Sequence, residues 1–278
     1  MPIRMPRRRF WAGLARRLAL YYLLILLTMT FIERWLVYPA PGAHEGDWAP
    51  PHLEFEDAHF ASADGTPLHG WFFAHPSPHR TVLYLHGNGV HVADIGDLMP
   101  VIANHLQADV LVFDYRGYGK SGGKPIEPRV IEDGLAASAW LADRTGSPVG
   151  RQVLIGRSIG AGVAVAMAER QGAGAVVAQC AFARLTDPAA DAFPWLPVRL
   201  LMRNRYPSVD RIQNYPGPLF SCHGTEDRVV AFEQGRQLFE AAPTDQKRFL
   251  TFEGMGHNEP LPRAYWQELA AFLDEVGA

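Results

Sequence analysis

Three residues of the types needed for nucleophilic catalysis occur in the order Ser158, Asp227, His257. A serine hydroxyl is a weak nucleophile at neutral pH, and it attacks a carbonyl carbon once a base removes its proton. A histidine can be that base when an acid holds its imidazole in the right orientation. Each of the three residues follows a short apolar stretch that is typical of a buried strand: residues 152–155, 218–224 and 248–252. Because the carboxyl ends of parallel strands meet at one edge of a sheet, we expect the three side chains to converge there.

Ser158 lies in the pentapeptide Gly-Arg-Ser-Ile-Gly, residues 156–160, between a predicted strand and a predicted helix over residues 159–171. Such a strand–turn–helix unit is a nucleophile elbow, in which a strained backbone exposes the serine above the sheet. Glycines are needed at both ends because a Cβ at Gly156 or Gly160 would collide with neighbouring backbone. Taken alone, the pentapeptide also fits an ordinary glycine-rich turn, so the acid and the histidine carry much of the argument.

Attack by a serine on a carbonyl carbon also needs hydrogen-bond donors for the oxyanion that forms. The strand predicted over residues 81–85 runs into the glycine-rich loop His-Gly-Asn-Gly, residues 86–89. We expect the backbone amides of Asn88 and Ile159 to be the two donors. Backbone donors place little demand on the side chain, so that of Asn88 has no assigned role.

Four segments together resemble the α/β-hydrolase superfamily: residues 83–89, 114–122, 156–161 and 223–227. The order serine, acid, histidine is also that of this superfamily. From about residue 53 to the C-terminus the sequence is similar to the membrane-anchored branch that includes α/β-hydrolase domain-containing proteins 13 and 17. The resemblance implies a serine hydrolase acting on esters, thioesters or amides. Some relatives remove palmitoyl groups from proteins, but the type 17 proteins carry a lipidated N-terminal cysteine cluster, and here the first cysteine is Cys180.

Residues 117–122 match the Gly-x-Gly-x-x-Gly pattern of dinucleotide-binding proteins, but the context differs. Pro125 and Pro128 follow where that pattern should open a helix, and a P-loop would need glycine where Asp114 stands. We therefore predict no nucleotide cofactor and a loop that walls the active site. Asp114 is a rival for the catalytic acid, but it precedes Ser158, so the expected order favours Asp227.

The remaining histidines and the two cysteines predict no metal site. The histidines form no Cys/His cluster with the spacing of metal ligands. His86 and His223 are expected to brace loops through hydrogen bonds. Cys180 and Cys222 lie in apolar strand-like runs, where each is expected to be a small buried hydrophobe.

The N-terminus predicts a membrane anchor. Residues 1–17 contain six arginines and no acid, and residues 18–32 carry no charge. This run is shorter than the roughly 20 residues that span a bilayer, but flanking arginines can snorkel, and Trp35 and Tyr38 suit the membrane interface. We expect a basic cytoplasmic segment at residues 1–17, a transmembrane anchor at 18–38 and a proline-rich tether at 39–52.

A cleaved signal peptide is the alternative, because the apolar run also has the length of a signal sequence. Its small residues lie beyond Glu33 and Arg34 and are interrupted by prolines, which favours an uncleaved anchor. The positive-inside rule then places the catalytic domain outside the cytoplasm, which in a bacterium is the periplasm. The net charge of −3 gives no support to nucleic-acid binding.

Residues 53–278 predict one α/β-hydrolase domain with a mostly parallel sheet and helices on both faces. Two strands joined through residues 64–65 form an entry hairpin, and later strands alternate with helices. The expected helices lie at residues 92–107, 129–144, 159–171, 232–242 and 261–276. Residues 181–215 are the one long excursion, rich in proline and aromatic residues. They are expected to be a lid or acyl-chain groove, or else a packed connector without substrate contact.

These features predict a membrane-anchored serine hydrolase that cleaves esters or thioesters through an acyl-enzyme. A serine aminopeptidase is a second hypothesis, but it needs acidic residues in its cap for a free amine, and the excursion offers Asp187, Asp191 and Asp210. A third is a non-catalytic binding protein on the same fold, which would not require a serine, an acid and a histidine at three strand ends.

Overall fold

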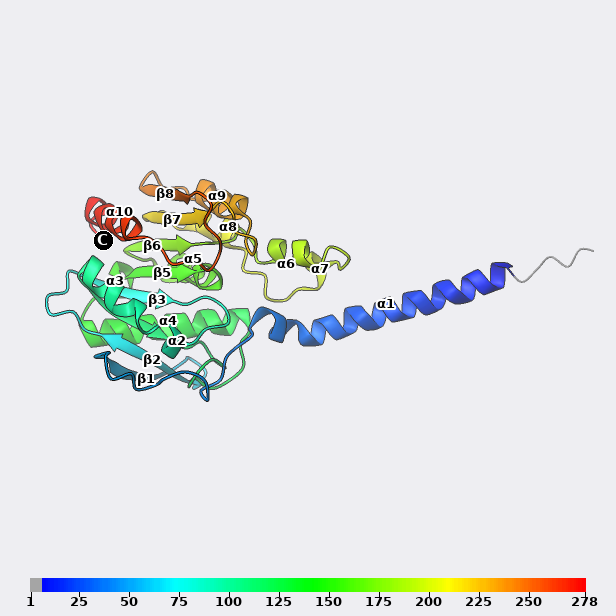
Figure 1. Ribbon diagram of the computed structural model, residues 1–278, viewed down its shortest axis with the longest axis horizontal. Helices are drawn as coiled ribbons and strands as arrows, with labels where there is room; N and C mark the ends of the chain where they lie inside the picture. The colour runs from blue at the N-terminus through cyan, green and yellow to red at the C-terminus, as the bar shows by residue number, and fades with distance from the viewer. Residues whose placement is uncertain (1–6) are drawn as a thin grey trace, which may run out of the picture.

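The computed structural model describes residues 7–278, so the first six residues of the predicted basic segment lie outside the described part. It consists of an α/β domain and a long helix, α1 (Arg7–Val37), which projects away from it (Figure 1). The chain enters the domain immediately after α1: the next residue, Tyr38, is buried, with 3% of its surface exposed.

An eight-stranded sheet forms the centre of the domain, with the strand order β1-β2-β4-β3-β5-β6-β7-β8. β1 and β2 pair antiparallel, β2 pairs antiparallel with β4, and the remaining strands are parallel to one another. The strands are β1 (Glu56–Ala61), β2 (Pro67–Phe73), β3 (Arg80–Leu85), β4 (Ala108–Phe113), β5 (Val153–Arg157), β6 (Ala175–Gln179), β7 (Leu219–Gly224) and β8 (Lys247–Phe252). The predicted α/β-hydrolase fold, a mostly parallel sheet entered through an antiparallel hairpin, is confirmed.

Helices cover both faces of the sheet, as the sequence predicts. Along β3, Val82 and Tyr84 point into one apolar layer while Leu83 and Leu85 point into the other, so both faces are buried. The first layer lies under α3 (Leu98–Leu106) and α10 (Arg263–Val276). The second lies under α4 (Glu127–Thr145), α5 (Ile159–Gln171) and α9 (Phe232–Ala241).

The single helix expected over residues 92–107 is wrong in one respect. The structure has two helices there, α2 (Val92–Ile95) and α3, separated at Gly96 and Asp97. Gly96 packs against the ring of Trp71, so close that a Cβ would lie 2.6 Å from a ring carbon. The helix is therefore interrupted at the point where the backbone packs against this buried tryptophan. Glycine also favours the interruption because its helix propensity is low.

Helix α1 is the one helix of the described chain that is long and apolar enough to cross a membrane, over Phe10–Val37. Its 28 residues correspond to about 42 Å, more than the roughly 30 Å of a hydrocarbon core. Most residues of that stretch are exposed, and the others are partly exposed. The helix is longer than the uncharged run because it begins among the arginines.

Residues 38–52 pack on the domain. The hydroxyl of Tyr38 lies 2.9 Å from that of Tyr206, so this residue is buried in the protein and not placed at a membrane interface as expected. Further along, the Gly119 amide donates to the carbonyl of Pro41, and the indole of Trp48 packs edge-on against Trp71. The segment after α1 is thereby fixed to the loop that follows β4.

Candidate active site

Ser158 lies at the sharp turn between β5 and α5, with a backbone φ of 53° and ψ of −116°. A positive φ is strained for a residue with a Cβ, as the elbow prediction requires. A Cβ at Gly156 would come within 2.3 Å of the Gly160 carbonyl oxygen, and one at Gly160 within 2.0 Å of the Leu85 carbonyl oxygen. The predicted collisions at both flanking glycines are therefore present.

Asp227 follows β7, and both of its carboxylate oxygens are occupied. Oδ1 accepts hydrogen bonds from the backbone amides of Val229, at 2.9 Å, and Val230, at 2.8 Å. Oδ2 lies 2.6 Å from Nδ1 of His257 and 3.1 Å from Nε2 of His223. The same Nε2 lies 2.9 Å from the Val230 carbonyl, which can only accept, so His223 carries its proton on Nε2. His223 thus braces the loop that carries Asp227, as expected.

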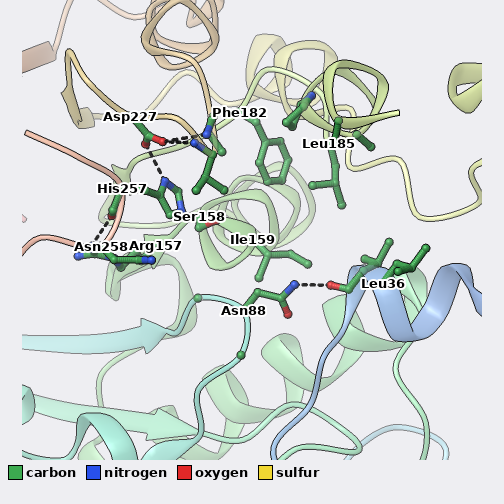
Figure 2. Close-up of a pocket in the computed structure, with 18 of the residues that line it drawn as sticks. Leu36, Asn88, Arg157, Ser158, Ile159, Phe182, Leu185, Asp227, His257 and Asn258 are labelled. Carbon is green, nitrogen blue, oxygen red and sulfur yellow. Dashed lines mark hydrogen bonds and ion pairs between the residues drawn. The ribbon is translucent and has the colours of Figure 1, made fainter. Parts of the chain in front are cut away.

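These donors keep Asp227 ionised. Its side chain is buried, and burial opposes ionisation, but the hydrogen bonds from His223 and His257 and from the Val230 amide outweigh that effect. The pKa of the Asp227 carboxyl is consequently held well below its ordinary value. An ionised Asp227 can only accept, so His257 donates from Nδ1 and its Nε2 remains free to act as a base. Figure 2 shows the His257 ring between Asp227 and Ser158.

Arg157, the residue before Ser158, holds the histidine loop in place. Its guanidinium donates to the backbone carbonyl of His257 at 2.7 Å and to that of Glu259 at 3.3 Å. The strand end that carries the serine is thereby tied to the loop that carries the histidine. Sequence reasoning missed this contact because it joins residues 100 positions apart.

Cys180 also lies beside these residues. Its sulfur, one oxygen of Asp227 and one nitrogen of His257 all lie within 4.8 Å of one another. Burial raises the pKa of the Cys180 thiol to about 11, which opposes the thiolate that a metal or a nucleophilic role would need. Cys180 and Cys222 are both buried and free, as expected.

The glycine-rich loop after β3 brings Asn88 to the same cavity as Ile159. The Asn88 side chain donates through Nδ2 to the carbonyl of Val37, the last residue of α1, and its Oδ1 accepts from the Tyr118 hydroxyl. The side chain that the sequence left unassigned therefore joins this loop to the end of α1 (Figure 2). His86 braces the loop, with Nδ1 2.8 Å from the Gly87 carbonyl.

A cavity of about 1290 Å³ opens beside Ser158, Asp227 and His257. Its other lining residues are mostly apolar, and most of them come from the loop after β3, the excursion after β6 and helix α1. The loop over residues 117–122, expected to wall the site, is absent from the lining residues of the described chain. It contacts a lining residue instead, because the Tyr118 hydroxyl donates to the side chain of Asn88.

The excursion over residues 181–215 forms one side of the cavity, through α6 (Thr186–Ala192) and α7 (Val198–Leu201). Leu185, Phe193 and Leu196 line it. Trp195, an aromatic residue of this excursion, is 54% exposed and does not line the cavity in the described chain. Its neighbours in the turn between α6 and α7 point inward instead.

Helix α1 forms the facing side, which the sequence did not indicate. Met29, Glu33, Leu36 and Val37 line the cavity. A sequence signal for this contact is Glu33, an acid at the end of the apolar run. In the sequence, Glu33 served only to mark where the expected anchor ends.

Asp114, the rival acid, is fully buried away from the cavity. Its Oδ1 accepts from the Val92 amide at 2.9 Å, and its Oδ2 from the Lys120 amide at 3.4 Å. Residues of the described chain that line the cavity do not include Asp114. Its contacts organise the loops after β3 and β4.

One further cluster is formed by the fold and is not indicated by the spacing of the histidines in the sequence. Asp57 and His59 on β1 face His69 on β2, and one ligand-type atom from each lies within 4.8 Å of the others. Nε2 of His69 is 2.8 Å from the Asp57 carboxylate. The cluster arises from the register of the β1–β2 hairpin. It lies at one edge of the sheet, and β7 and β8 lie at the other edge.

Comparisons with known proteins agree with this fold. A family model described as the alpha/beta hydrolase fold matches residues 80–209. An uncharacterised protein of Mycobacterium tuberculosis is 36% identical over 199 residues, which cover 71% of this chain and 70% of that protein. Human alpha/beta hydrolase domain-containing protein 17B is 32% identical over 203 residues, with coverages of 72% and 68%. A solved esterase structure from Pyrococcus furiosus has a TM-score of 0.70 and 25% identity, covering 85% of this chain and 98% of the esterase. The chain therefore belongs to the α/β-hydrolase family and has an esterase-like hydrolase fold.

Proposed function

We propose that the protein is a membrane-anchored serine hydrolase that cleaves carboxylic esters or thioesters through an acyl-enzyme. The observation that carries this proposal is the Asp227–His257 pair, joined at 2.6 Å, with its imidazole placed toward Ser158 on a strained elbow. This is the arrangement that activates a serine hydroxyl.

In the proposed reaction, Ser158 Oγ attacks the carbonyl carbon while His257 Nε2 takes the hydroxyl proton. Asp227 stabilises the resulting imidazolium, and the amides of Asn88 and Ile159 donate to the oxyanion. The tetrahedral intermediate collapses when His257 gives its proton to the leaving alcohol or thiol, which leaves an acyl group on Ser158. A water molecule, deprotonated by His257, then attacks the acyl-enzyme. His257 returns that proton to Ser158 Oγ as the bond between Oγ and the acyl carbon breaks and the acid leaves.

The apolar cavity supports an acyl group as the part of the substrate that is bound. Leu185, Leu196 and Leu36 line the same cavity as the candidate nucleophile Ser158. Burial of apolar chain against such residues favours binding by about 0.8 kcal/mol for each methylene.

Anchoring through α1 is the second part of the proposal. We propose residues 1–17 as a basic cytoplasmic segment, residues 18–38 as the anchor and residues 53–278 as the catalytic domain on the far side of the membrane. Support comes from the exposed apolar surface of α1 and from the arginines at its N-terminal end, which precede the uncharged run. The expected result is that the protein stays with membranes after alkaline carbonate washing, and that a reporter active only outside the cytoplasm works when fused after Ala278. A soluble mature protein beginning near Ala43 contradicts it.

The aminopeptidase alternative has less support. Two of the three acids that were candidates to bind a free amine are already paired with arginines. Asp187 lies 3.0 Å from Arg199, and Asp210 lies 2.6 Å from Arg184. Asp191 alone of the three lines the cavity.

Labelling with a fluorophosphonate tests the proposed chemistry, because the reagent reacts with an activated serine. The full-length protein should be labelled and should hydrolyse p-nitrophenyl esters or acyl thioesters. Ser158→Ala should abolish labelling, His257→Ala should reduce the rate by several orders of magnitude, and Ser77→Ala, an exposed serine, should change neither. Full labelling of a folded Ser158→Ala variant would falsify the assignment.

A further inference from the structure

The segment formed by α6, α7 and the turn between them lies alongside α1 (Figure 1). The Tyr22 hydroxyl donates to the carbonyl of Trp195 at 3.0 Å. Nearer the domain, Glu33 accepts hydrogen bonds from the backbone amides of Arg203, at 2.8 Å, and Asn204, at 2.9 Å. The turn between α6 and α7 and the residues just after α7 are thus both held against α1.

The contact with Tyr22 sets the level of this segment along α1. Tyr22 precedes Glu33 by 11 residues, which corresponds to about 16 Å of helix. Residues 18–32 carry no charge, so any hydrocarbon layer that α1 crosses must be centred on them. Trp195 contacts Tyr22, which lies within this run, and is therefore at the level of that layer.

The surface of the segment fits a lipid environment. Leu200 is 79% exposed and Trp195 is 54% exposed, and neither lines the cavity within the described chain. Residues 186–201 contain three charged residues: Asp187 and Arg199 pair at 3.0 Å, and Asp191 lines the cavity. Two large apolar side chains therefore face outward on a segment whose arginine has an ion-pair partner.

We propose that residues 186–201 lie within the lipid bilayer beside α1, so that the acyl layer of the membrane covers Leu200 and Trp195. The inference rests on the anchoring proposed above. It extends the membrane contact from α1 to the excursion that faces it across the cavity. Met29 on α1 and Leu196 on the excursion both line the cavity, so in this arrangement the part of its wall that they form lies at the level of the acyl layer. A substrate with a long acyl chain then reaches Ser158 from the membrane and not from water.

Spin-label accessibility tests this arrangement on the full-length protein in phosphatidylcholine bilayers. Cys180 and Cys222 are 5% and 2% exposed, so a nitroxide reagent will select a cysteine introduced at the surface. Leu200→Cys probes the segment and removes little packing, because that side chain is exposed. Leu27→Cys, at a 54% exposed position of α1, probes the anchor, and Val101→Cys, at a 37% exposed position of α3, is the aqueous control.

The labels at positions 27 and 200 should collide more often with oxygen, which partitions into lipid, than with a water-soluble nickel chelate. The label at position 101 should show the reverse. An aqueous label at position 200 beside a lipid-exposed label at position 27 overturns the inference and leaves the anchor standing. Aqueous labels at both positions overturn the inference together with the anchoring.

A rate measurement gives an independent readout. Leu200→Glu places a charge on the proposed lipid-facing surface, and Val101→Glu places one on the control surface. For Leu200→Glu we expect at least a tenfold fall in the rate on a long-chain ester embedded in vesicles, relative to the rate on water-soluble p-nitrophenyl butyrate. Val101→Glu should keep the ratio of the wild type. An unchanged ratio in Leu200→Glu contradicts the inference, and failure of the wild type to react with either ester contradicts the proposed hydrolase.

Discussion

Glu33, four residues before the end of α1, accepts two hydrogen bonds from Asn204, from its backbone amide at 2.9 Å and from its side-chain nitrogen at 2.8 Å. Asn204 in turn accepts from the Glu127 amide at 2.7 Å and from the Tyr38 hydroxyl at 3.3 Å. One side chain thereby joins α1, α4 and the segment after α7. Helix α1 and the excursion that enclose the cavity are held together through it.

The Glu33–Asn204 contact should therefore matter for both stability and catalysis. Glu33→Ala removes an acceptor from three donors, and hydrogen bonds to charged groups contribute about 1.5–3 kcal/mol each in favourable cases. We expect a fall of about 1–3 kcal/mol in the free energy of unfolding and a larger loss of kcat/KM for long-chain than for short-chain esters. Denaturant unfolding in detergent and an ester panel measure the two effects.

Glu33→Gln is the matched variant, because it keeps a carbonyl oxygen at the same position while removing the charge. It should retain most of the stability that Glu33→Ala loses. Equal stability of all three proteins would show that the contact contributes nothing to holding the excursion against α1.

The two buried acids should separate by their effects on rate. Asp227→Asn leaves the His257 ring without its carboxylate partner, and we expect kcat to fall by a factor on the order of 10⁴. Asp114→Asn should act on thermal stability and on the position of the loops after β3 and β4, because its contacts are with the Val92 and Lys120 amides. If Asp114→Asn proved the more damaging to kcat at normal thermal stability, the proposed triad would be wrong.

The ionisation of Asp227 predicts how its contribution to stability depends on pH. Its pKa in the folded protein lies below the value of about 3.9 for an unfolded aspartate. A lowered folded-state pKa means that the unfolded state takes up the proton first, so the stabilisation is complete above pH 4 and is lost as the pH falls through the folded-state pKa. The difference in Tm between the wild type and Asp227→Asn should therefore be smaller at pH 3 than at pH 5. A difference that is equal or larger at pH 3 contradicts a lowered pKa.

The sequence predicted the fold and the candidate residues because their signals are local. Gly156 and Gly160 flank Ser158 in the pattern that an elbow needs. In the structure, Gly156 lies against the Gly160 carbonyl within the elbow itself, and Gly160 lies against the Leu85 carbonyl at the end of β3. The strands ahead of Asp227 and His257 are apolar enough to be recognised from composition alone.

The contacts of α1 with the cavity could not be predicted in the same way. An apolar run has the same composition whether lipid or protein covers it, and Glu33 reaches Asn204 across 171 positions of the chain. Tyr38 shows the same limit, since an aromatic residue next to an apolar run suits both a membrane interface and a protein core. The Asp57–His59–His69 cluster depends on the β1–β2 register, in which His59 pairs with His69.

Two adjacent residues of the excursion should differ in their effect on acyl-chain selectivity. Leu196 is 8% exposed and lines the cavity, whereas Trp195 points outward and meets α1 through its carbonyl. For water-soluble p-nitrophenyl esters in detergent, kcat/KM should rise from acetyl to hexanoyl. Four added methylenes at up to about 0.8 kcal/mol each give at most about 3 kcal/mol, or roughly 200-fold. Leu196→Ala should flatten this rise, because the cavity loses apolar contact with the chain, while Trp195→Ala should leave its slope as in the wild type. A preference for acetyl esters that Leu196→Ala leaves unchanged would remove the cavity from acyl binding, and efficient cleavage of aminoacyl amides would favour the peptidase instead.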